Sequence, residues 1–357
     1  SLTLILVTEE DNANRDHVTA LLDLIFQSMV FLYGLDDLSN IKNIERVKRE
    51  IKICFPIIDY LLDKYETDNM SDLTQCVSVM ASNENTVLQQ YLEGFAEAAS
   101  SPYGCLQVDG SVAVATPQWW NLNSLETVLL SKFISSCPNS ASRDLPVFLP
   151  LTSPTVPHRL LTYQLIPGVD VCILCGPKPS LSELERDVNQ FWRPVLDSLR
   201  SCHSLCPRNV PSSFAVDQNI FGFVLINLQS HKCLCYSVPD EERQVKGSAG
   251  VQGTDRRRAM RHFYTSVVGN LFPATPPWNS KEDDVTAGIK DLSNLSDSLI
   301  HPPRETYTVS STHKCYAIQR SPFQLFLLFD PTVPTYALRS VSNKVFESLI
   351  SDKHIHV

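Results

Sequence analysis

The feature that most constrains this chain is a local order of elements that occurs three times: an apolar strand, a short polar cap and an amphipathic helix. The apolar strands are predicted at residues 2–7, 169–175 and 323–329. Copies this far apart are too widely spaced for a solenoid, so they predict three related domains. The first copy has almost no sequence before it, and we therefore expect an N-terminally trimmed first domain.

The two later copies close units that share one predicted order: two strands, a helix, three strands and a final helix. Asp109 and Gly110 separate two alternating runs of the second unit, and this pair is a strong hairpin signal because both turn positions need a positive φ. We therefore predict an α+β fold, in which each complete unit is a five-stranded antiparallel sheet packed with helices. The first unit, a strand and two helices, is predicted to be incomplete.

The predicted domain boundaries follow from shifts in polarity along the chain. They are a first-domain remnant at 1–66, a polar linker at 67–85, a second domain at 86–206 and a third at 212–357. Two polar stretches rich in Gly, Ser and Pro, at 240–254 and 275–304, are predicted insertions of the third domain.

Composition narrows the functional classes. A net charge of -9 argues against a general nucleic-acid binder, because phosphate affinity needs clustered Lys and Arg. The sequence holds no uncharged apolar run long enough to span a bilayer. The 11 cysteines stand in apolar contexts, which indicates reduced core thiols and a cytoplasmic protein.

No motif predicts a catalytic residue, a metal ligand or a cofactor site. Cys172 and Cys175 are spaced like zinc ligands, but an odd offset on a strand sends their side chains to opposite faces. Cys233 and Cys235 share a face without a second pair at metal-like spacing. A hydrolase or redox enzyme that uses His158 and Cys175 is the remote alternative.

Two short segments are candidate binding sites. Arg256, Arg257, Arg258 and Arg261 form a basic run at the start of a predicted helix, where they contact either solvent alone or an anionic lipid headgroup or acidic partner. Trp119 and Trp120 follow a predicted strand, and adjacent positions point different ways. One ring is expected in the core, and the other is a candidate partner anchor.

Some short sequence segments are more specific than a pattern of strands and helices. They are LTQCV (73–77), GFAEAA (94–99), SPTVPHRLLT (153–162), LCGP (174–177) and RHFYT (261–265). As a set they resemble the Fuzzy family of planar cell polarity proteins, and the resemblance extends from the first strand to the last helix. It implies three longin domains in tandem, the first incomplete. This agrees with the order of elements predicted from the residues.

The resemblance also implies a function. It implies a planar cell polarity effector and ciliogenesis scaffold of the cytoplasm, cytoskeleton and cilium basal body, which forms a heterodimer with an Inturned homologue. Further implied partners are a WD-repeat planar polarity effector, a small Rab-like GTPase, intraflagellar transport proteins recruited to basal bodies, and phosphoinositide membranes. No partner of this set is a nucleic acid.

Three hypotheses follow. The first is a scaffold subunit that is not an enzyme and that uses the exposed helix faces between Arg15 and Leu35. There Gly34 ends a helix and either caps it or shapes a partner loop. The second is a subunit of a Rab guanine-nucleotide exchange factor, active only as a heterodimer and without a catalytic side chain. The third is a membrane adaptor that binds phosphoinositides through the basic run.

Overall fold

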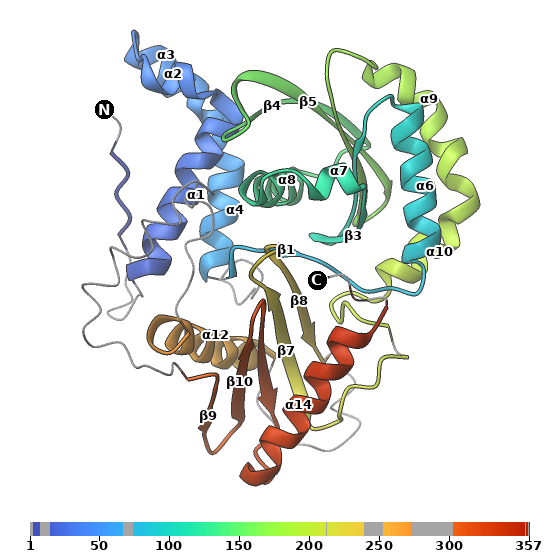
Figure 1. Ribbon diagram of the computed structural model, residues 1–357. Coiled ribbons are helices and arrows are strands. Elements are labelled where there is room, and N and C mark those ends of the chain that lie inside the picture. The colour runs from blue at the N-terminus through green and yellow to red at the C-terminus, as the bar shows by residue number, and fades with distance from the viewer. Residues whose placement is uncertain are drawn as a thin grey trace.

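The computed structural model describes residues 3–7, 15–66, 74–211, 213–238, 253–272, 303–353, 355 and 357. Two sheets, each flanked by helices, form the second and third domains, and the helices of the first unit lie against the second domain (Figure 1). The predicted α+β architecture of tandem domains is confirmed.

From Arg15 to Glu66 the first unit contains helices joined by short turns, and no strand. It consists of α1 (Arg15–Tyr33), α2 (Leu35–Ser39), α3 (Ile44–Glu50), the 3-10 helix η1 (Ile51–Cys54) and α4 (Phe55–Glu66). Gly34 ends α1 with φ 90°, and its N–H donates to the Val30 carbonyl at 2.9 Å, which confirms the predicted helix end.

The strand predicted at residues 2–7 is wrong over its described part, because residues 3–7 form no ladder. An extended segment becomes a strand only beside another strand, and no strand pairs with it among the described residues. Instead, Leu4 and Leu6 pack against the core of the second domain, while Ile5 and Val7 are exposed. Residue 2 and the predicted polar cap at 8–11 lie outside the described residues.

The second domain follows the predicted order closely. Its elements are α6 (Asn85–Ala98), β2 (Tyr103–Val108), β3 (Ser111–Ala115), α7 (Pro117–Trp120), α8 (Ser124–Ser136), β4 (Ser142–Leu149), β5 (Ser153–Ile166), β6 (Val169–Cys175), α9 (Leu181–Trp192), the 3-10 helix η2 (Arg193–Val195) and α10 (Leu196–His203). Asp109 and Gly110 both have positive φ, which confirms the hairpin turn. The closing helix, predicted as continuous, is interrupted at Pro194, which lacks a backbone N–H.

The third domain repeats the order. Its elements are β7 (Ile220–Asn227), β8 (Lys232–Ser237), α12 (Gly253–Asn270), β9 (Glu305–Val309), β10 (Lys314–Arg320), β11 (Phe323–Phe329) and α14 (Thr335–Ser351). The strands are arranged β3-β2-β6-β5-β4 in the second domain and β8-β7-β11-β10-β9 in the third, which is the same order. The predicted insertions lie almost entirely outside the described residues, and α12 begins at residue 253.

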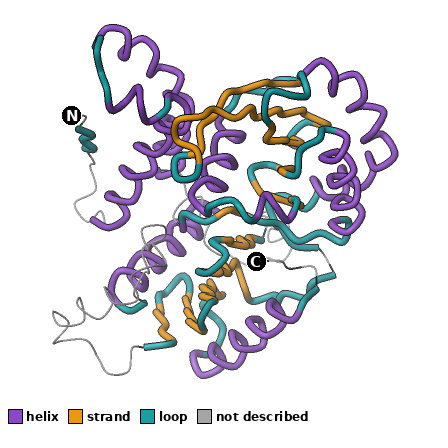
Figure 2. The backbone as a smooth tube through the Cα atoms, turned by 45° about the horizontal axis from the view of Figure 1, so that its top comes forward, coloured by secondary structure: helices purple, strands orange, loops and turns teal. Residues whose placement is uncertain are grey.

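Both faces of each sheet are covered. In the second domain, α8 covers one face and α1 and α4 pack over it, while α6, α9 and α10 cover the other. Cys172 belongs to the first of these cores and Cys175 to the second, which confirms that the two thiols point to opposite faces. In the third domain, α12 and α14 lie on opposite faces of the sheet, as the turned view also shows (Figure 2).

Part of the predicted linker is a buried joint between the two sheets. β1 (Val77–Ser78) runs parallel to β8, and the N–H groups of Val77 and Val79 donate to the carbonyls of His231 and Cys233, each at 2.9 Å. Val79 also bridges in parallel to Val112 of β3. One extended segment therefore lies between equivalent edges of the two sheets, and residues 76–82 are all buried.

Candidate interaction surfaces

The basic run lies in the first turns of α12, and the structure divides it. Arg256 is only 3% exposed, and its guanidinium donates to the Val238 carbonyl at 3.2 Å. Burial, and then the neighbouring charge of Arg257, lower the pKa of Arg256. Arg257 and Arg258 are exposed and Arg261 is half-buried. The four arginines therefore do not form one surface, because Arg256 points inward.

A cleft of about 890 Å³ separates the second domain from the third. We call it the interdomain cleft. Among the described residues, the charged or amide side chains that line it are Gln107, Asp109, Lys132, Asn139, Arg143, Gln164, Asp170, Asn209, Arg256 and Arg257. Arg258 and Arg261 do not line it. Arg256 and Arg257 of α12 thus line the cleft, whereas the next residue, Arg258, is on the surface outside it.

The two carboxylates of the cleft are in different environments. Asp109 lies 3.1 Å from Nε2 of His203, which is half-exposed and belongs to the end of α10. Asp170 of β6 is mostly enclosed, and burial raises the pKa of its carboxyl, an effect that the charge of Arg143 opposes. Burial thus makes Asp170 a weaker acid than an ordinary surface carboxyl group.

The two tryptophans pack in different places, one in a core and one between two domains. Trp119 is completely buried in the core under α8, with its backbone N–H held by the Thr116 hydroxyl at the start of α7. Trp120 is half-buried and packs against the cores of both domains. The Lys232 ammonium of β8 lies 3.8 Å from the centroid of the Trp120 ring, so this ring contacts the third domain.

The exposed faces predicted on the first helix are small. Among residues 17–35, the exposed side chains are those of Thr19 and Asp23, since the second half of α1 packs against the second domain. Apolar exposure lies farther along the first unit, at Ile44, Ile53 and Phe55, whose exposed fractions are 64%, 51% and 48%.

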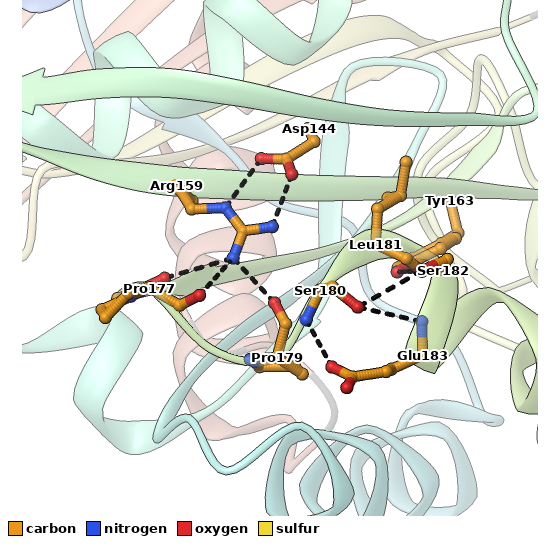
Figure 3. Close-up of polar contacts among 10 residues, drawn as sticks. Asp144, Arg159, Tyr163, Pro177, Pro179, Ser180, Leu181, Ser182 and Glu183 are labelled. Atoms are coloured by element: carbon orange, nitrogen blue, oxygen red, sulfur yellow. Dashed lines mark hydrogen bonds and ion pairs between the residues drawn. The ribbon is translucent and has the colours of Figure 1, made fainter.

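The segment at 153–162 contains Arg159, which holds the loop that precedes α9 in place. Arg159 of β5 forms a double contact with the Asp144 carboxylate and donates to the carbonyls of Pro177 and Pro179, at 3.0 and 2.8 Å (Figure 3). The loop then enters α9 through a capping box between Ser180 and Glu183. These contacts stabilise the loop, and they engage the guanidinium group of Arg159.

Cys175, the thiol considered for a redox function, is not activated, whereas a hydrogen bond with Cys235 lowers the pKa of the buried Cys233 thiol. All eleven cysteines are unpaired by disulfides, and burial raises the pKa of Cys175, which disfavours a reactive thiolate. Across the described residues, no group of three His, Cys, Asp or Glu side chains could hold a metal ion. No described helix is long and apolar enough to cross a bilayer.

Apart from Arg256 and Arg257, the charged residues of the cleft were not predicted as site residues from the sequence. Lys132 and Arg143 come from α8 and β4, and Gln107 and Asp170 come from β2 and β6. Gln107 and Asp170 are single polar residues between apolar ones, and Lys132 and Arg143 stand beside other polar residues without a motif, so no spacing marks any of the four. Their common position depends on how the second and third domains are joined.

Comparison with known proteins adds the family relationship. Three family models match in order, described as the first, second and third longin domains of FUZ, MON1 and HPS1, over residues 1–61, 99–193 and 219–353. The chain is 42% identical to protein fuzzy homolog of Xenopus tropicalis over 99% of this chain and 83% of that protein. It is 37% identical to protein fuzzy homolog of Homo sapiens, over 98% of this chain and 81% of that protein.

Proposed function

The chain belongs to the Fuzzy family, and from that membership we propose that it is a planar cell polarity effector and ciliogenesis scaffold. In this proposal it forms a heterodimer with an Inturned homologue, binds a WD-repeat planar polarity effector and a small Rab-like GTPase, and supports recruitment of intraflagellar transport proteins to basal bodies. Its site of action is the cytoplasm and cytoskeleton at the cilium base.

One observation carries the proposal: the likeness to proteins named fuzzy homolog extends over 98–99% of the chain, including all three longin domains. The longin-domain family is generally non-catalytic, which fits a scaffold. The GTPase and the partner subunit would therefore be recognised by surfaces.

The first unit offers an interface for the heterodimer. Ile44, Ile53 and Phe55 expose apolar side chains on neighbouring helical segments of this unit. A contiguous exposed apolar patch marks a protein contact, and we infer that these three side chains contribute to one. We place the contact with the Inturned homologue here.

The test is co-purification of the chain with its Inturned homologue, followed by light scattering. We expect a one-to-one complex that is weakened by Ile44→Glu together with Phe55→Glu, whereas the matched control Glu45→Lys, on the same helical segment, leaves it intact. Failure of the unaltered chain to form any complex would overturn the proposal. Addition of the GTPase loaded with a fluorescent nucleotide then separates a scaffold from an exchange factor subunit, because only the second accelerates nucleotide release.

A membrane adaptor is the second candidate, because Arg257 and Arg258 are exposed on α12. Exposed cations near a membrane contribute about 1 kcal/mol each to binding of anionic lipids. Reversal of both charges should abolish sedimentation with phosphoinositide vesicles while the heterodimer still forms. Unchanged sedimentation would exclude this candidate.

A further inference from the structure

We propose that a second space between the two sheets, which we call the apolar pocket, binds an aliphatic carboxylate, a small molecule with one hydrocarbon chain and one carboxylate group. This site is separate from the scaffold function, since its ligand is a small molecule and not a partner protein. Three features of the molecule support it: the walls of the pocket, the sign of the charges that line it, and the setting of Lys232 beside Trp120.

The apolar pocket lies across the joint at β1 from the interdomain cleft. It has a volume of about 590 Å³, and Val79 lines it, whereas the preceding residue, Ser78, lines the interdomain cleft. Consecutive residues of an extended segment point to opposite sides, so the joint separates the two spaces. The volume is within the roughly 300–1,000 Å³ of small-molecule sites, and such sites often occur where domains meet.

The walls of the pocket are mainly aliphatic. Val112 of β3, Met80 of the joint and Leu234 of β8 line it, and each belongs to a different hydrophobic core. Ile355 and Val357 pack against the third-domain core and close another side, where the C-terminus returns to the joint (Figure 1). The pocket is thus the space at the junction of three cores, and a hydrocarbon chain placed there is removed from water.

The charges that line the pocket favour an anion. Among the described residues, the only charged side chains on its lining are lysines, Lys232 of β8 and Lys353. Even if Val357 carries a terminal carboxylate, the cations remain in excess, in a chain whose net charge is -9. The field in this space therefore attracts a negatively charged ligand.

Lys232 is the cation that a carboxylate would meet inside the pocket. It is half-buried, and its ammonium lies 3.8 Å from the centroid of the Trp120 ring, which also lines the pocket. Burial lowers its pKa, and no neighbouring carboxylate among the described residues opposes this effect. The ring accepts no conventional hydrogen bond, so the ammonium keeps donors for a ligand, and a carboxylate beside it would offset the cost of its burial.

A partly buried ammonium fits a carboxylate better than a phosphate. A phosphate carries more charge and more acceptor oxygens than one ammonium can pair, and the described lining contains no guanidinium group, which binds phosphate through two parallel hydrogen bonds. The aliphatic walls fit the rest of the ligand, because each buried methylene adds to its affinity. Both domains line the pocket, so a bound ligand would contact the two at once.

The first experiment is calorimetric titration of the full chain with decanoate, below the concentration at which it forms micelles. We expect saturable one-to-one binding, and an affinity that rises from hexanoate through octanoate to decanoate by up to about fourfold for each methylene. Decanol, the uncharged molecule of the same chain length, should bind about tenfold more weakly or worse, because it cannot form an ion pair with Lys232. No saturable binding, no rise along the series, or equal affinity for decanol would overturn the proposal.

The second experiment tests the role of the lysine. Lys232→Met should weaken decanoate binding by roughly tenfold, the effect of one charge-assisted hydrogen bond. The matched control is Lys344→Met on α14, an exposed lysine that does not line the pocket, and it should change affinity by less than about twofold. Methionine keeps the aliphatic part of the side chain, so both variants should fold. An equal loss in both variants assigns binding to general surface charge, and it contradicts the proposal, as does unchanged binding in Lys232→Met.

The third experiment locates the ligand without relying on affinity. A decanoate that is brominated in the middle of its chain quenches indole fluorescence only at short range. Trp120 lines the pocket, whereas Trp119 is buried in the core under α8 and does not line it. Saturating ligand should therefore quench the unaltered chain, and Trp120→Phe should lose most of that quenching. Quenching that persists in this variant would place the ligand elsewhere and exclude the apolar pocket.

Discussion

The helices α8 and α12 hold equivalent positions, because each connects the second strand of its sheet to the third. Every residue from 125 to 134 of α8 is buried, including Glu126 and Lys132. In contrast, α12 has an exposed side that carries Arg257, Arg258 and His262. The difference arises because α1 and α4 pack over α8, which shows that the neighbouring unit, and not the position in the fold, decides which helix is a surface.

A second pair of equivalent positions shows the opposite, a role that both domains keep. Arg159 pairs with Cys175 and Lys314 pairs with Phe329, so each cation lies opposite the last residue of the final strand. Each donates to carbonyls of the loop that leads into the closing helix, Lys314 to that of Val333. The two domains thus secure the same turn with different cations.

The largest effect should come from removing the contact between α8 and the first unit. Phe133 meets Phe31 of α1 edge-to-face, with ring centroids 5.5 Å apart. We expect Phe133→Ala to lower the free energy of unfolding by about 3–5 kcal/mol, the cost of an emptied aromatic site, in urea denaturation. His262→Ala on the exposed side of α12 should stay within about 0.5 kcal/mol. Equal losses of unfolding free energy in the two variants would contradict the difference in burial between α8 and α12.

Removing the loop anchors should distinguish the two cations. Arg159→Met loses the ion pair with Asp144 and several carbonyl contacts, and we expect a loss of about 2–3 kcal/mol in the free energy of unfolding. Lys314→Met should cost about 1 kcal/mol, because one carbonyl contact is lost. In the Arg159→Met variant, hydrogen exchange of backbone amides should also accelerate in the loop before α9. A larger loss for Lys314 would contradict this order.

The joint between the sheets can be tested by a double-mutant cycle. The hydroxyls of Ser78 and Ser111 are 2.9 Å apart and buried. Ser78→Ala and Ser111→Ala should each cost about 1 kcal/mol, and the double variant should cost less than their sum, because a buried hydrogen bond is lost only once. Strict additivity would indicate that the two hydroxyls do not interact in solution.

The smallest effect should come from Lys232→Met beside Trp120. Burial lowers the pKa of Lys232 below its ordinary 10.5, so the unfolded chain binds more protons than the folded one between the lowered value and 10.5. The stability of the unaltered chain relative to the variant should therefore rise as pH increases through that range. We expect a change below about 1 kcal/mol, checked by urea denaturation. If the stability of the unaltered chain relative to the variant fell as pH increased, the result would contradict a pKa of Lys232 lowered by burial.

Much of the fold could be predicted from sequence because its signals are local. Apolar runs predict β6 and β11, and the pair Asp109 and Gly110 predicts its hairpin. β1 could not be predicted, since two residues pair with a strand of a distant domain. The interdomain cleft could not be predicted for the same reason, because its cations come from α8, β4 and α12. For the tryptophans, adjacency predicts divergent rings, but only the assembled domains show that Trp120 reaches Lys232.

The joint at β1 also has a consequence for the order of assembly during synthesis. The second domain can complete its own sheet soon after β6 emerges, whereas Val77 and Val79 must wait for His231 and Cys233 of the third domain. Contacts between residues so far apart in sequence form slowly, since a long loop has to close first. The seam between the two sheets therefore closes only after the second domain has formed. Until translation has passed β8, the nascent chain keeps the side of this segment that faces β8 unpaired, while Val79 can already bridge to Val112 of β3.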